Sequence, residues 1–440
     1  MDTPICDFVK NYAASQTLRL HMPGHKGCGP LGMEAWDITE VTGAGNLYEA
    51  RGISAISEAN ASALFGCPTF FSTEGSSHCI RAMLYLCLLY GKQTGRRPLI
   101  AAGRNAHKVL LSAAALLDLE ITWLYPENGS SYLSCPISSE TLDRALSEIY
   151  EKPVAVYVTS PDYLGNMLDI AALAEVAHKH GCLLAVDNAH GAYLKFLSES
   201  LHPMDLGADL CCSSAHKTLP VLTGGAYLYT SAALCAQAKN ALALFGSTSP
   251  SYLILQSLDA ANKVLADAYP KELAKTVQRV QELKARLADY CFTGNEPMKL
   301  TINAAKYGYT GTKLAERLRQ ARIECEFADP EHLVLMVSTS TTEADLRRLE
   351  DALSAIPKGA AISAVPPALH KPKRVLSIRE AVMSPCETLP VSQCEGRILA
   401  AATVGCPPAV PILVCGELID RQIIQRLQHY GIENCCVVAQ

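Results

Sequence analysis

The stretch PVAVYVTSPDYLGNMLDIAALAEVAHKHGCLLAVD, residues 153–187, decides the fold. Its first part, VAVYV at 154–158, is a continuous apolar run of the kind that forms a buried strand. A helical pattern follows, ends at Gly181, and places four apolar residues on one face. These residues are Ile170, Leu173, Ala174 and Ala177. The run CLLAVD then predicts a second strand that ends at Asp187, so the stretch reads as a βαβ unit of a parallel sheet.

The same alternation of apolar runs and helical periodicity indicates a large α/β domain over residues 51–270. Residues 1–50 precede it, and their many Pro and Gly residues predict an arm without regular structure. A charged helix, candidate strands and a further helix predict a smaller α/β domain over residues 271–356. Residues 357–373 have the Pro and Ala content of a linker, and residues 374–440 form a terminal segment.

The composition of the 440-residue chain is that of a globular protein. Hydrophobic residues make up 49% and charged residues 18%, which disfavours both disorder and a coiled coil. The net charge of -5 provides no basic surplus that would attract nucleic acid or anionic lipid. We therefore expect a small-molecule partner, with no nucleic acid and no membrane.

The cysteines and the N-terminus predict a cytoplasmic protein. Eighteen cysteines in a chain of this length, many inside apolar runs, are typical of reduced core thiols rather than a disulfide scaffold. The pairs Cys211-Cys212 and Cys435-Cys436 would point to opposite faces of a strand, so we predict no metal site. No signal-peptide pattern opens the chain, and its longest apolar run, residues 82–90, is too short to span a bilayer.

Polar residues that directly follow strand-like runs are the first candidates for chemistry, because reactive groups gather at the carboxyl ends of parallel strands. Asp187 ends its strand, and Lys217 follows another apolar run in DLCCSSAHKT, after Ser214 and His216. Taken alone, Asp187 also fits a turn or a helix cap. A single lysine at a strand end is usually just solvated.

Two further places carry chemistry-bearing residues. In TEGSS, Gly75, Ser76 and Ser77 open an apolar helix, and such a helix start suits a phosphate monoester. Ordinary capping by serine explains the same pattern. His107 follows the strand-like run LIAA at 99–102, where a satisfied core histidine is the alternative.

Considered together, Asp187, Lys217 thirty residues later and the Gly-Ser helix start are the groups needed to hold pyridoxal phosphate. The lysine amine forms a Schiff base with the cofactor aldehyde. The aspartate keeps the pyridine nitrogen protonated, so that the ring withdraws electrons, and the two opposite charges stabilise each other. The sequence therefore predicts a pyridoxal-phosphate enzyme.

Several motifs in order resemble the Orn/Lys/Arg decarboxylases of pyridoxal-phosphate fold type I. The motifs are LRLHMPGHKG (18–27), RNAHKVLLSA (104–113), VDNAHGAYL (186–194), SSAHKTLPVLTGGAYL (213–228), STSPSYLILQSLDAA (247–261) and GRILAAATVGCPPAVPILVCGE (396–417). The resemblance implies an aspartate-aminotransferase-like large domain with a mainly parallel sheet, plus a smaller C-terminal α/β domain. It looks like the short bacterial form, because nothing before the arm resembles the wing domain of the long members.

The resemblance also assigns catalytic roles. Lys217 matches the Schiff-base lysine, Asp187 the partner of the pyridine nitrogen, and His107 the imidazole that stacks on the cofactor ring. His190 occupies the position near the phenolic oxygen of the cofactor. The phosphate contacts fall to the helix start and to the residues before the lysine, namely Gly75, Ser76, Ser77, Ser214 and His216.

Thr248 and Ser249 match a loop that in the family reaches the active site of the neighbouring subunit. This match implies a homodimer or a larger homo-oligomer with shared active sites. The implied reaction is decarboxylation of lysine, arginine or ornithine to the corresponding amine and carbon dioxide, as in polyamine biosynthesis. Substrate amine would displace Lys217, and the bond to the carboxylate would stand roughly perpendicular to the ring.

The chain departs from the family pattern in ways that leave the substrate open among these three amino acids. Glu74-Gly75 replaces Asn-Gly before the phosphate serines, which places a carboxylate near a phosphate, and Asn188 replaces a glutamate after Asp187. The segment GAGNLYEARGIS, 43–54, lacks the usual His and Pro-Glu-Gly run. In the terminal motif, Cys406 and Ala409 replace an aromatic residue and a glycine.

Two other functions fit the same residues. The first is another pyridoxal-phosphate reaction, such as transamination, because a fold does not determine which bond to Cα breaks. The second is a cofactor-binding subunit without turnover, a hypothesis that Glu74 and the altered 43–54 segment motivate.

Overall fold

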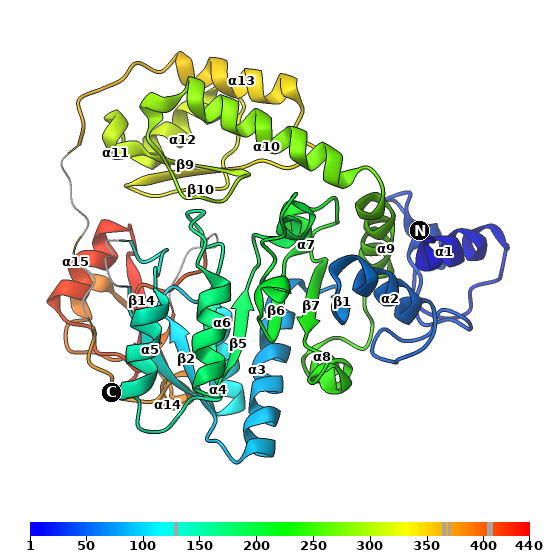
Figure 1. The fold of residues 1–440 in the computed structure, drawn as a ribbon, viewed down its shortest axis with the longest axis horizontal. Helices are drawn as coiled ribbons and strands as arrows, with labels where there is room; N and C mark the ends of the chain where they lie inside the picture. The colour runs from blue at the N-terminus through cyan, green and yellow to red at the C-terminus, as the bar shows by residue number, and fades with distance from the viewer. Residues whose placement is uncertain (127–130, 363–366, 368–370, 403–407) are drawn as a thin grey trace. The chain divides into compact units, whose positions relative to one another are not determined.

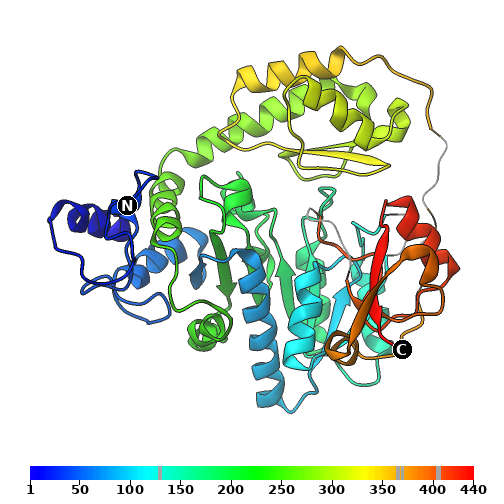
Figure 2. The same cartoon turned by 180° about the vertical axis from the view of Figure 1, so that it is seen from behind.

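The structure is a computed structural model that describes most of the chain. The described residues are 1–126, 131–362, 367, 371–402 and 408–440. The chain divides into two compact units, one made of residues 1–90 and 183–274 and the other of residues 91–182 and 275–440. Figures 1 and 2 show the elements of both units from opposite sides. In the described part of the chain, no helix combines the length and the apolar character that crossing a membrane requires.

The first unit contributes four neighbouring strands in the order β1-β7-β6-β5. Their bounds are Thr69–Ser72 for β1, Ala226–Thr230 for β7, Leu210–Ser213 for β6 and Leu183–Asp187 for β5. β5 and β6 run parallel, whereas β7 is antiparallel to both β1 and β6. β5 is the strand that the sequence predicted to end at Asp187, and it and β6 end at Asp187 and Ser213 on the same edge.

The helices that lie wholly in the first unit are α1 (Pro4–Ala14), α2 (Ile53–Phe65), α7 (Ala215–Thr218), α8 (Ala238–Phe245) and α9 (Tyr252–Ala266). Two helices cross the boundary between the units: α3 (Gly75–Thr94) begins in the first unit, and α10 (Tyr269–Arg286) lies mostly in the second. Single turns of 3₁₀-helix are η1 (Glu34–Trp36), η2 (Ala192–Phe196), η3 (Pro203–Leu206) and η4 (Cys235–Gln237). α3 contains the apolar helix expected after TEGSS, and α10 contains the charged helix expected after residue 270.

The helix α1 is a difference from the prediction of an arm without regular structure. The glycines and prolines that predicted irregular chain begin only at Pro23. Before them, Pro4 occupies the first turn, where its missing N–H costs nothing, and Ile5 and Val9 provide a buried stripe at helical spacing. The arm therefore begins with a helix that packs on α2 and α9.

A buried carboxylate fixes the start of α1. Asp259 in α9 is fully buried, and its Oδ2 accepts hydrogen bonds from the backbone N–H groups of Ile5 and Cys6, both at 2.9 Å. Its Oδ1 accepts a third bond from the hydroxyl of Ser57 in α2 at 2.6 Å. Burial raises the pKa of Asp259, although these three bonds oppose the rise. The carboxylate thus satisfies two of the N–H groups that a helix start leaves without partners.

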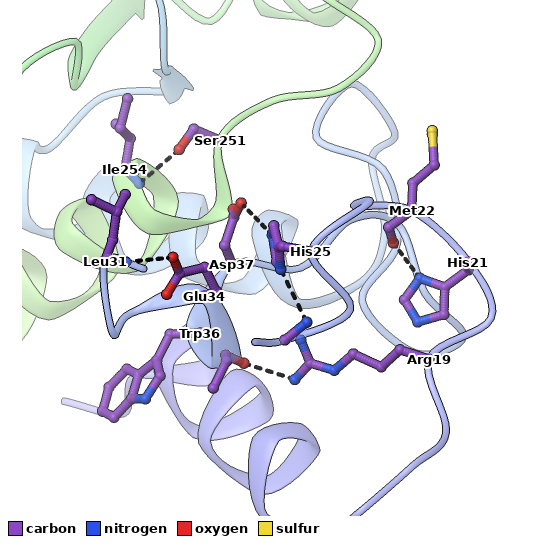
Figure 3. Close-up of polar contacts among 12 residues, drawn as sticks. Arg19, His21, Met22, His25, Leu31, Glu34, Trp36, Asp37, Ser251 and Ile254 are labelled. Carbon is purple, nitrogen blue, oxygen red and sulfur yellow. Dashed lines mark hydrogen bonds and ion pairs between the residues drawn. The ribbon is translucent and has the colours of Figure 1, made fainter. Parts of the chain in front are cut away.

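The loop after α1 is tied to itself by polar contacts (Figure 3). Arg19 donates to the carbonyl of Ala35 at 2.7 Å, His25 contacts Asp37 at 3.2 Å, and the N–H of Leu31 donates to Glu34 at 2.7 Å. The same loop exposes several large apolar side chains, with exposed fractions between 50% and 81%. They are Leu18, Leu20, Met22, Leu31, Met33 and Trp36.

The second unit contains a parallel group of three strands in the order β4-β2-β3. Their bounds are Ala155–Thr159 for β4, Leu99–Gly103 for β2 and Glu120–Leu124 for β3, and the helices between them in sequence are α4 (Lys108–Leu117), α5 (Ser139–Glu148) and α6 (Ile170–Lys179). The predicted apolar face of α6 is confirmed, since its buried residues are Ile170, Leu173, Ala174 and Ala177. The strand, helix and strand predicted within residues 153–187 are present as β4, α6 and β5.

Two smaller antiparallel sheets complete the second unit. The four-stranded sheet has the order β10-β11-β9-β8, and the three-stranded sheet has the order β12-β14-β13. The strands are β8 (Phe292–Thr293), β9 (Lys299–Asn303), β10 (Phe327–Ala328), β11 (His332–Met336), β12 (Cys386–Pro390), β13 (Leu399–Ala401) and β14 (Asn434–Val438). The accompanying helices are η5 (Ala288–Tyr290), α11 (Ala304–Tyr307), α12 (Gly311–Gln320), α13 (Glu343–Ser354), α14 (Ile378–Met383), η6 (Val391–Gln393) and α15 (Arg421–His429). Of the predicted linker, residues 363–366 and 368–370 lie outside the described residues, as does Cys406.

The core of the first unit contains a fully buried histidine. His202 packs against the rings of Phe65 and Tyr229, with ring centroids 5.6 and 4.7 Å away, and its Nδ1 accepts from the N–H of Met204 at 3.4 Å. Burial lowers the pKa of His202 to about 3. The imidazole is therefore neutral in the folded protein at every pH at which the protein would ordinarily be handled.

The depressed pKa of His202 makes stability depend on pH. Below pH 6.5, the usual pKa of histidine, the unfolded chain binds a proton at His202 and the folded chain does not. The contribution of His202 to the free energy of unfolding is therefore complete above pH 6.5 and decreases as the pH falls toward about 3. The loss from this group is about 1.4 kcal/mol per pH unit. We expect His202→Gln to make urea denaturation midpoints fall less steeply below pH 6.5, whereas His178→Gln, at an exposed position of α6, should not. Equal slopes in the two variants would contradict the assignment.

Candidate active site

The strand ends of β5 and β6 position the predicted acid. Asp187 is the last residue of β5, is only 2% exposed, and pairs in register with Cys212 of β6. Its Oδ1 accepts from the N–H of Ala189 at 3.2 Å and from the thiol of Cys212 at 3.8 Å. Burial, and then the charge of Asp187, raise the pKa of the Cys212 thiol well above its usual value. A carboxylate held in this way at a strand end keeps a fixed orientation.

The predicted lysine lies on the short helix that follows β6. Lys217 belongs to α7, and its Nζ lies 3.1 Å from the Nε2 of His190, which is 5% exposed in the turn after Asp187. The backbone N–H of Lys217 donates to the carbonyl of Ser214 at 3.1 Å. The amine is thus directed at the loop that carries Asp187, so the structure brings the lysine, the acid and His190 together.

The start of α3 adjoins the segment that carries the lysine. The hydroxyl of Ser214 donates to the hydroxyl of Ser76 at 2.8 Å, and the N–H of Gly75 donates to the carbonyl of Gly224 at 2.7 Å. Gly224 has φ +99°, and a Cβ there would lie 2.8 Å from the carbonyl oxygen of Thr73, so only glycine permits this close approach. The hydroxyls of Ser76 and Ser214 therefore meet at the first turn of α3, and hydroxyls beside the start of a helix suit a phosphate group.

Two predicted phosphate residues have other contacts. The Nδ1 of His216 and its backbone N–H both lie within bonding distance of the carbonyl of Gly225, at 3.0 and 3.1 Å. Ser77 is part of the first turn of α3 and is partly buried. Their contacts to a phosphate stay predictions.

The unexpected Glu74 has a specific partner. This exposed carboxylate accepts from the N–H of Ser247 at 2.7 Å, so it ties the turn before α3 to the loop after α8. Thr248 and Ser249 follow in that loop and are both exposed, and the N–H of Ser249 donates to the hydroxyl of Ser247 at 3.1 Å. Their role in a neighbouring active site stays a prediction.

His107 belongs to the second unit, where it caps a helix. It precedes α4, and its Nδ1 accepts from the N–H of Val109 at 3.2 Å. This is a local role that serine, aspartate and asparagine usually fill at helix starts. Because the two units are described separately, the stacking of His107 on a cofactor ring stays a prediction.

Sequence reasoning missed two residues that shape the site. Asn188 is fully buried, and its side-chain nitrogen donates to the hydroxyl of Ser213 at 3.0 Å. His78 in α3 accepts from the hydroxyl of Ser72 at 2.8 Å and donates through Nε2 to the carbonyl of Leu242 at 2.7 Å, which anchors the helix start to α8. Burial lowers the pKa of His78 and favours this neutral form. In the sequence, Asn188 stands out only as a departure from the family motif, and no pattern in the sequence points to His78.

The residues present fit pyridoxal phosphate. The donor set combines one amine, one buried carboxylate and paired hydroxyls at the start of a 20-residue helix. A Cβ built on Gly75 would meet no atom within 4 Å, so space is open at the helix start. Among the described residues, the Oδ1 of Asn188, directly after Asp187, is buried without a hydrogen-bond partner. Such an atom usually accepts a hydrogen bond from a bound group or water. Lys217 would hold the cofactor covalently, Asp187 would face its pyridine nitrogen, and Ser76 and Ser214 its phosphate.

The sequence matches two family descriptions that together cover most of the chain. Residues 3–294 match the Orn/Lys/Arg decarboxylase major domain, and residues 360–431 match the Orn/Lys/Arg decarboxylase C-terminal domain. An arginine decarboxylase of Bacillus subtilis is 28% identical over 96% of this chain and 92% of its own length.

Solved structures agree on the fold. The lysine decarboxylase LdcF of Francisella novicida superposes with a TM-score of 0.81 at 17% identity, over 99% of this chain and 81% of its own. A structure described as SPT with its PLP internal aldimine superposes with a TM-score of 0.54 at 13% identity, over 69% of this chain and 75% of its own. The predicted α/β fold, with a mainly parallel sheet and the architecture of fold type I, is confirmed. The chain belongs to the Orn/Lys/Arg decarboxylase family, the pyridoxal-phosphate-dependent amino-acid decarboxylases that its motifs resemble.

Proposed function

We propose that this protein decarboxylates a basic amino acid, with arginine as the preferred substrate. The observation that carries the reaction is the contact between the Lys217 amine and His190 at 3.1 Å, beside the buried Asp187. The substrate is supported by the arginine decarboxylases that match at 27% to 28% identity over more than nine-tenths of the chain. Lysine decarboxylases match in fold at 16% to 18% identity.

The residues of the chain divide the work of this reaction. Bound pyridoxal phosphate supplies an electron sink for the bond between Cα and the carboxylate. Asp187 holds the proton on the pyridine nitrogen through its negative charge, which the buried position makes effective. Lys217 would hold the cofactor through its amine, and the Nε2 of His190 accepts a hydrogen bond that directs this amine. The Ser76 and Ser214 hydroxyls keep the phosphate end in place.

A homodimer with shared active sites is part of the proposal. The loop of residues 18–36 exposes six large apolar side chains, a pattern that soluble proteins usually cover with a partner. Thr248 and Ser249 are exposed, as a loop that reaches another subunit requires. The seventeen cysteines that the structure describes are all free thiols, which supports the proposed cytoplasmic location. A role in polyamine synthesis follows from the proposed reaction, because decarboxylation of a basic amino acid yields an amine with a second basic group.

The test is turnover of a panel of amino acids by the cofactor-loaded protein. Arginine, lysine, ornithine and a set of neutral and acidic amino acids are supplied singly, and the amine and carbon dioxide products are measured by mass spectrometry. We expect kcat/KM for arginine to exceed that for lysine and ornithine by roughly tenfold or more. The same panel with Lys217→Ala protein measures the background.

Other outcomes would overturn parts of the proposal. A higher kcat/KM for lysine or ornithine would replace arginine but keep the reaction. A keto acid with no carbon dioxide would show transamination instead. No product from any amino acid, with cofactor bound to Lys217, would show a subunit without turnover.

A further inference from the structure

A second polar cluster lies in the second unit, at the turn before β11. Asp329 is 5% exposed, and its Oδ1 accepts from the N–H groups of Glu331 and His332 at 2.8 and 2.6 Å. These two bonds lock the turn and hold the three side chains next to each other. One ligand atom from each of the three residues lies within 4.8 Å of the other two.

Three buried atoms of this cluster have no hydrogen-bond partner in the described part of the chain. They are the Oδ2 of Asp329, the Oε2 of Glu331 and the Nδ1 of His332. The Nδ1 of His332 has one longer contact, with the Oδ1 of Asp329 at 3.4 Å, so the two carboxylate oxygens carry most of the argument. Buried carboxylate oxygens without donors are costly, and such groups in a folded protein usually indicate a bound water or ion. Two carboxylate oxygens and one imidazole nitrogen are also the atoms that bind divalent metal ions.

The charge around the cluster favours a cation. Asp329 and Glu331 bring two negative charges, and the buried Arg426 of α15 supplies one positive charge that interacts with Glu331. The Nη1 of Arg426 donates to the carbonyl of Pro367 at 2.9 Å, so part of this guanidinium serves the backbone. The net charge of these three groups is therefore negative by one unit, and this charge attracts a cation.

The surroundings suit a metal site with an open position. Asp329 lines a cavity of about 410 Å³ together with His429, Tyr430, Val410 and Ile412. The Nε2 of His429 in α15 lies 2.5 Å from the Oε1 of Glu331. A histidine bound to a ligating carboxylate orients the ligand, and the cavity gives the ion a path and a place for water.

We propose that Asp329, Glu331 and His332 bind one divalent first-row metal ion of the Mn²⁺ class. The ion would take its remaining ligands from the cavity, and it would connect the turn before β11 to α15 through the Glu331 and His429 pair. None of these three residues is among those assigned to decarboxylation, and the proposal differs from the expectation of no metal that the cysteine spacing gave. The sequence D-P-E-H brings the three ligands within four positions, but only the fold adds His429 and the cavity.

The experiment is a titration of the full-length, tag-free, cofactor-loaded protein with Mn²⁺, followed by the electron paramagnetic resonance signal of the free ion. Mn²⁺ is chosen because it prefers carboxylate and imidazole to thiolate, so the many cysteines do not compete. We expect wild-type protein to bind about one ion per chain. Asp329→Asn and His332→Gln should each weaken binding by about a hundredfold, and His429→Gln by about tenfold.

The matched control is Asp143→Asn. Asp143 accepts from His180 at 2.6 Å, so it forms the same kind of carboxylate and histidine pair at a partly buried place in the second unit, outside the cluster. This variant should bind Mn²⁺ like the wild type. Circular dichroism without metal shows whether each variant folds. If Asp329→Asn protein does not fold, Mn²⁺ binding by His332→Gln protein is the test of the proposal.

A second readout is thermal stability. At about a hundred times its Kd, Mn²⁺ should raise the Tm of the wild type and of Asp143→Asn by roughly 5 °C, and that of folded His332→Gln by much less. Wild-type protein that leaves the free Mn²⁺ signal unchanged would overturn the proposal. Equal Mn²⁺ binding by wild-type, Asp329→Asn and His332→Gln proteins would also overturn it.

Discussion

Replacing Lys217 by alanine should abolish turnover and the covalent attachment of the cofactor. The Lys217 amine is the nucleophile that α7 directs toward His190, and alanine leaves no amine to take its place. We expect kcat to fall by about a thousandfold or more. Borohydride reduction of the loaded wild type should leave a phosphopyridoxyl group on the peptide that contains Lys217, and the variant should carry none.

Lys195→Ala is the control for this change. Lys195 belongs to the same unit and forms a surface ion pair with Asp205 at 2.8 Å, so its loss removes a lysine without touching the strand ends. It should keep both the reducible cofactor link and the rate. A Lys217→Ala protein that retains wild-type turnover, or a reduced tag on a different lysine, would refute the assigned role.

Replacing Asp187 by asparagine should leave the fold and the bound cofactor in place but slow the reaction. Asparagine has the same shape, and its oxygen can still accept from the N–H of Ala189. The negative charge is lost, so the pyridine nitrogen loses the partner that keeps it protonated. We expect kcat to fall by about 10²- to 10³-fold, or roughly 3 to 4 kcal/mol of transition-state stabilisation.

A cofactor analogue distinguishes this electrostatic role from a structural one. Pyridoxal phosphate methylated at the ring nitrogen carries a permanent positive charge, so it should restore much of the rate in Asp187→Asn protein. Asp205→Asn, at the surface ion pair, should behave as wild type with the natural cofactor. A near-normal rate in Asp187→Asn, or no rescue by the methylated analogue, would exclude the electron-sink argument.

The fold and the central residues could be predicted because they depend on local patterns. The buried run of β4, the apolar face of α6 and the run of β5 each lie within a continuous segment, so their periodicity is visible in the sequence. Asp187 and Lys217 became candidates by the same logic, because Asp187 is the last residue of β5 and Lys217 lies on the short helix that follows β6. Parallel pairing of β5 and β6 then places both ends on one edge.

Contacts between distant segments could not be predicted in this way. The sequence places the carboxylate of Glu74 near a predicted phosphate site but gives it no partner. Its partner is the N–H of Ser247, which is far away in the sequence. The role of His107 beside a cofactor ring stays a prediction, because it depends on a contact between distant segments, and the contact that the structure describes is the local helix cap with Val109. The cluster at Asp329 needed His429 from α15, and no spacing rule connects the two.

The anchoring of α1 by Asp259 has a consequence for making shorter versions of the protein. Removing the residues before Asp7 would delete both backbone donors to Oδ2 and leave the carboxyl group of Asp259 with the Ser57 hydroxyl as its one described donor. Such a truncation should therefore cost more than the trimming of a loose tail, because a carboxyl group that loses its donors is destabilising whether it stays charged or takes up a proton. Extending the chain from the exposed Met1 with a fusion tag leaves those donors where they are.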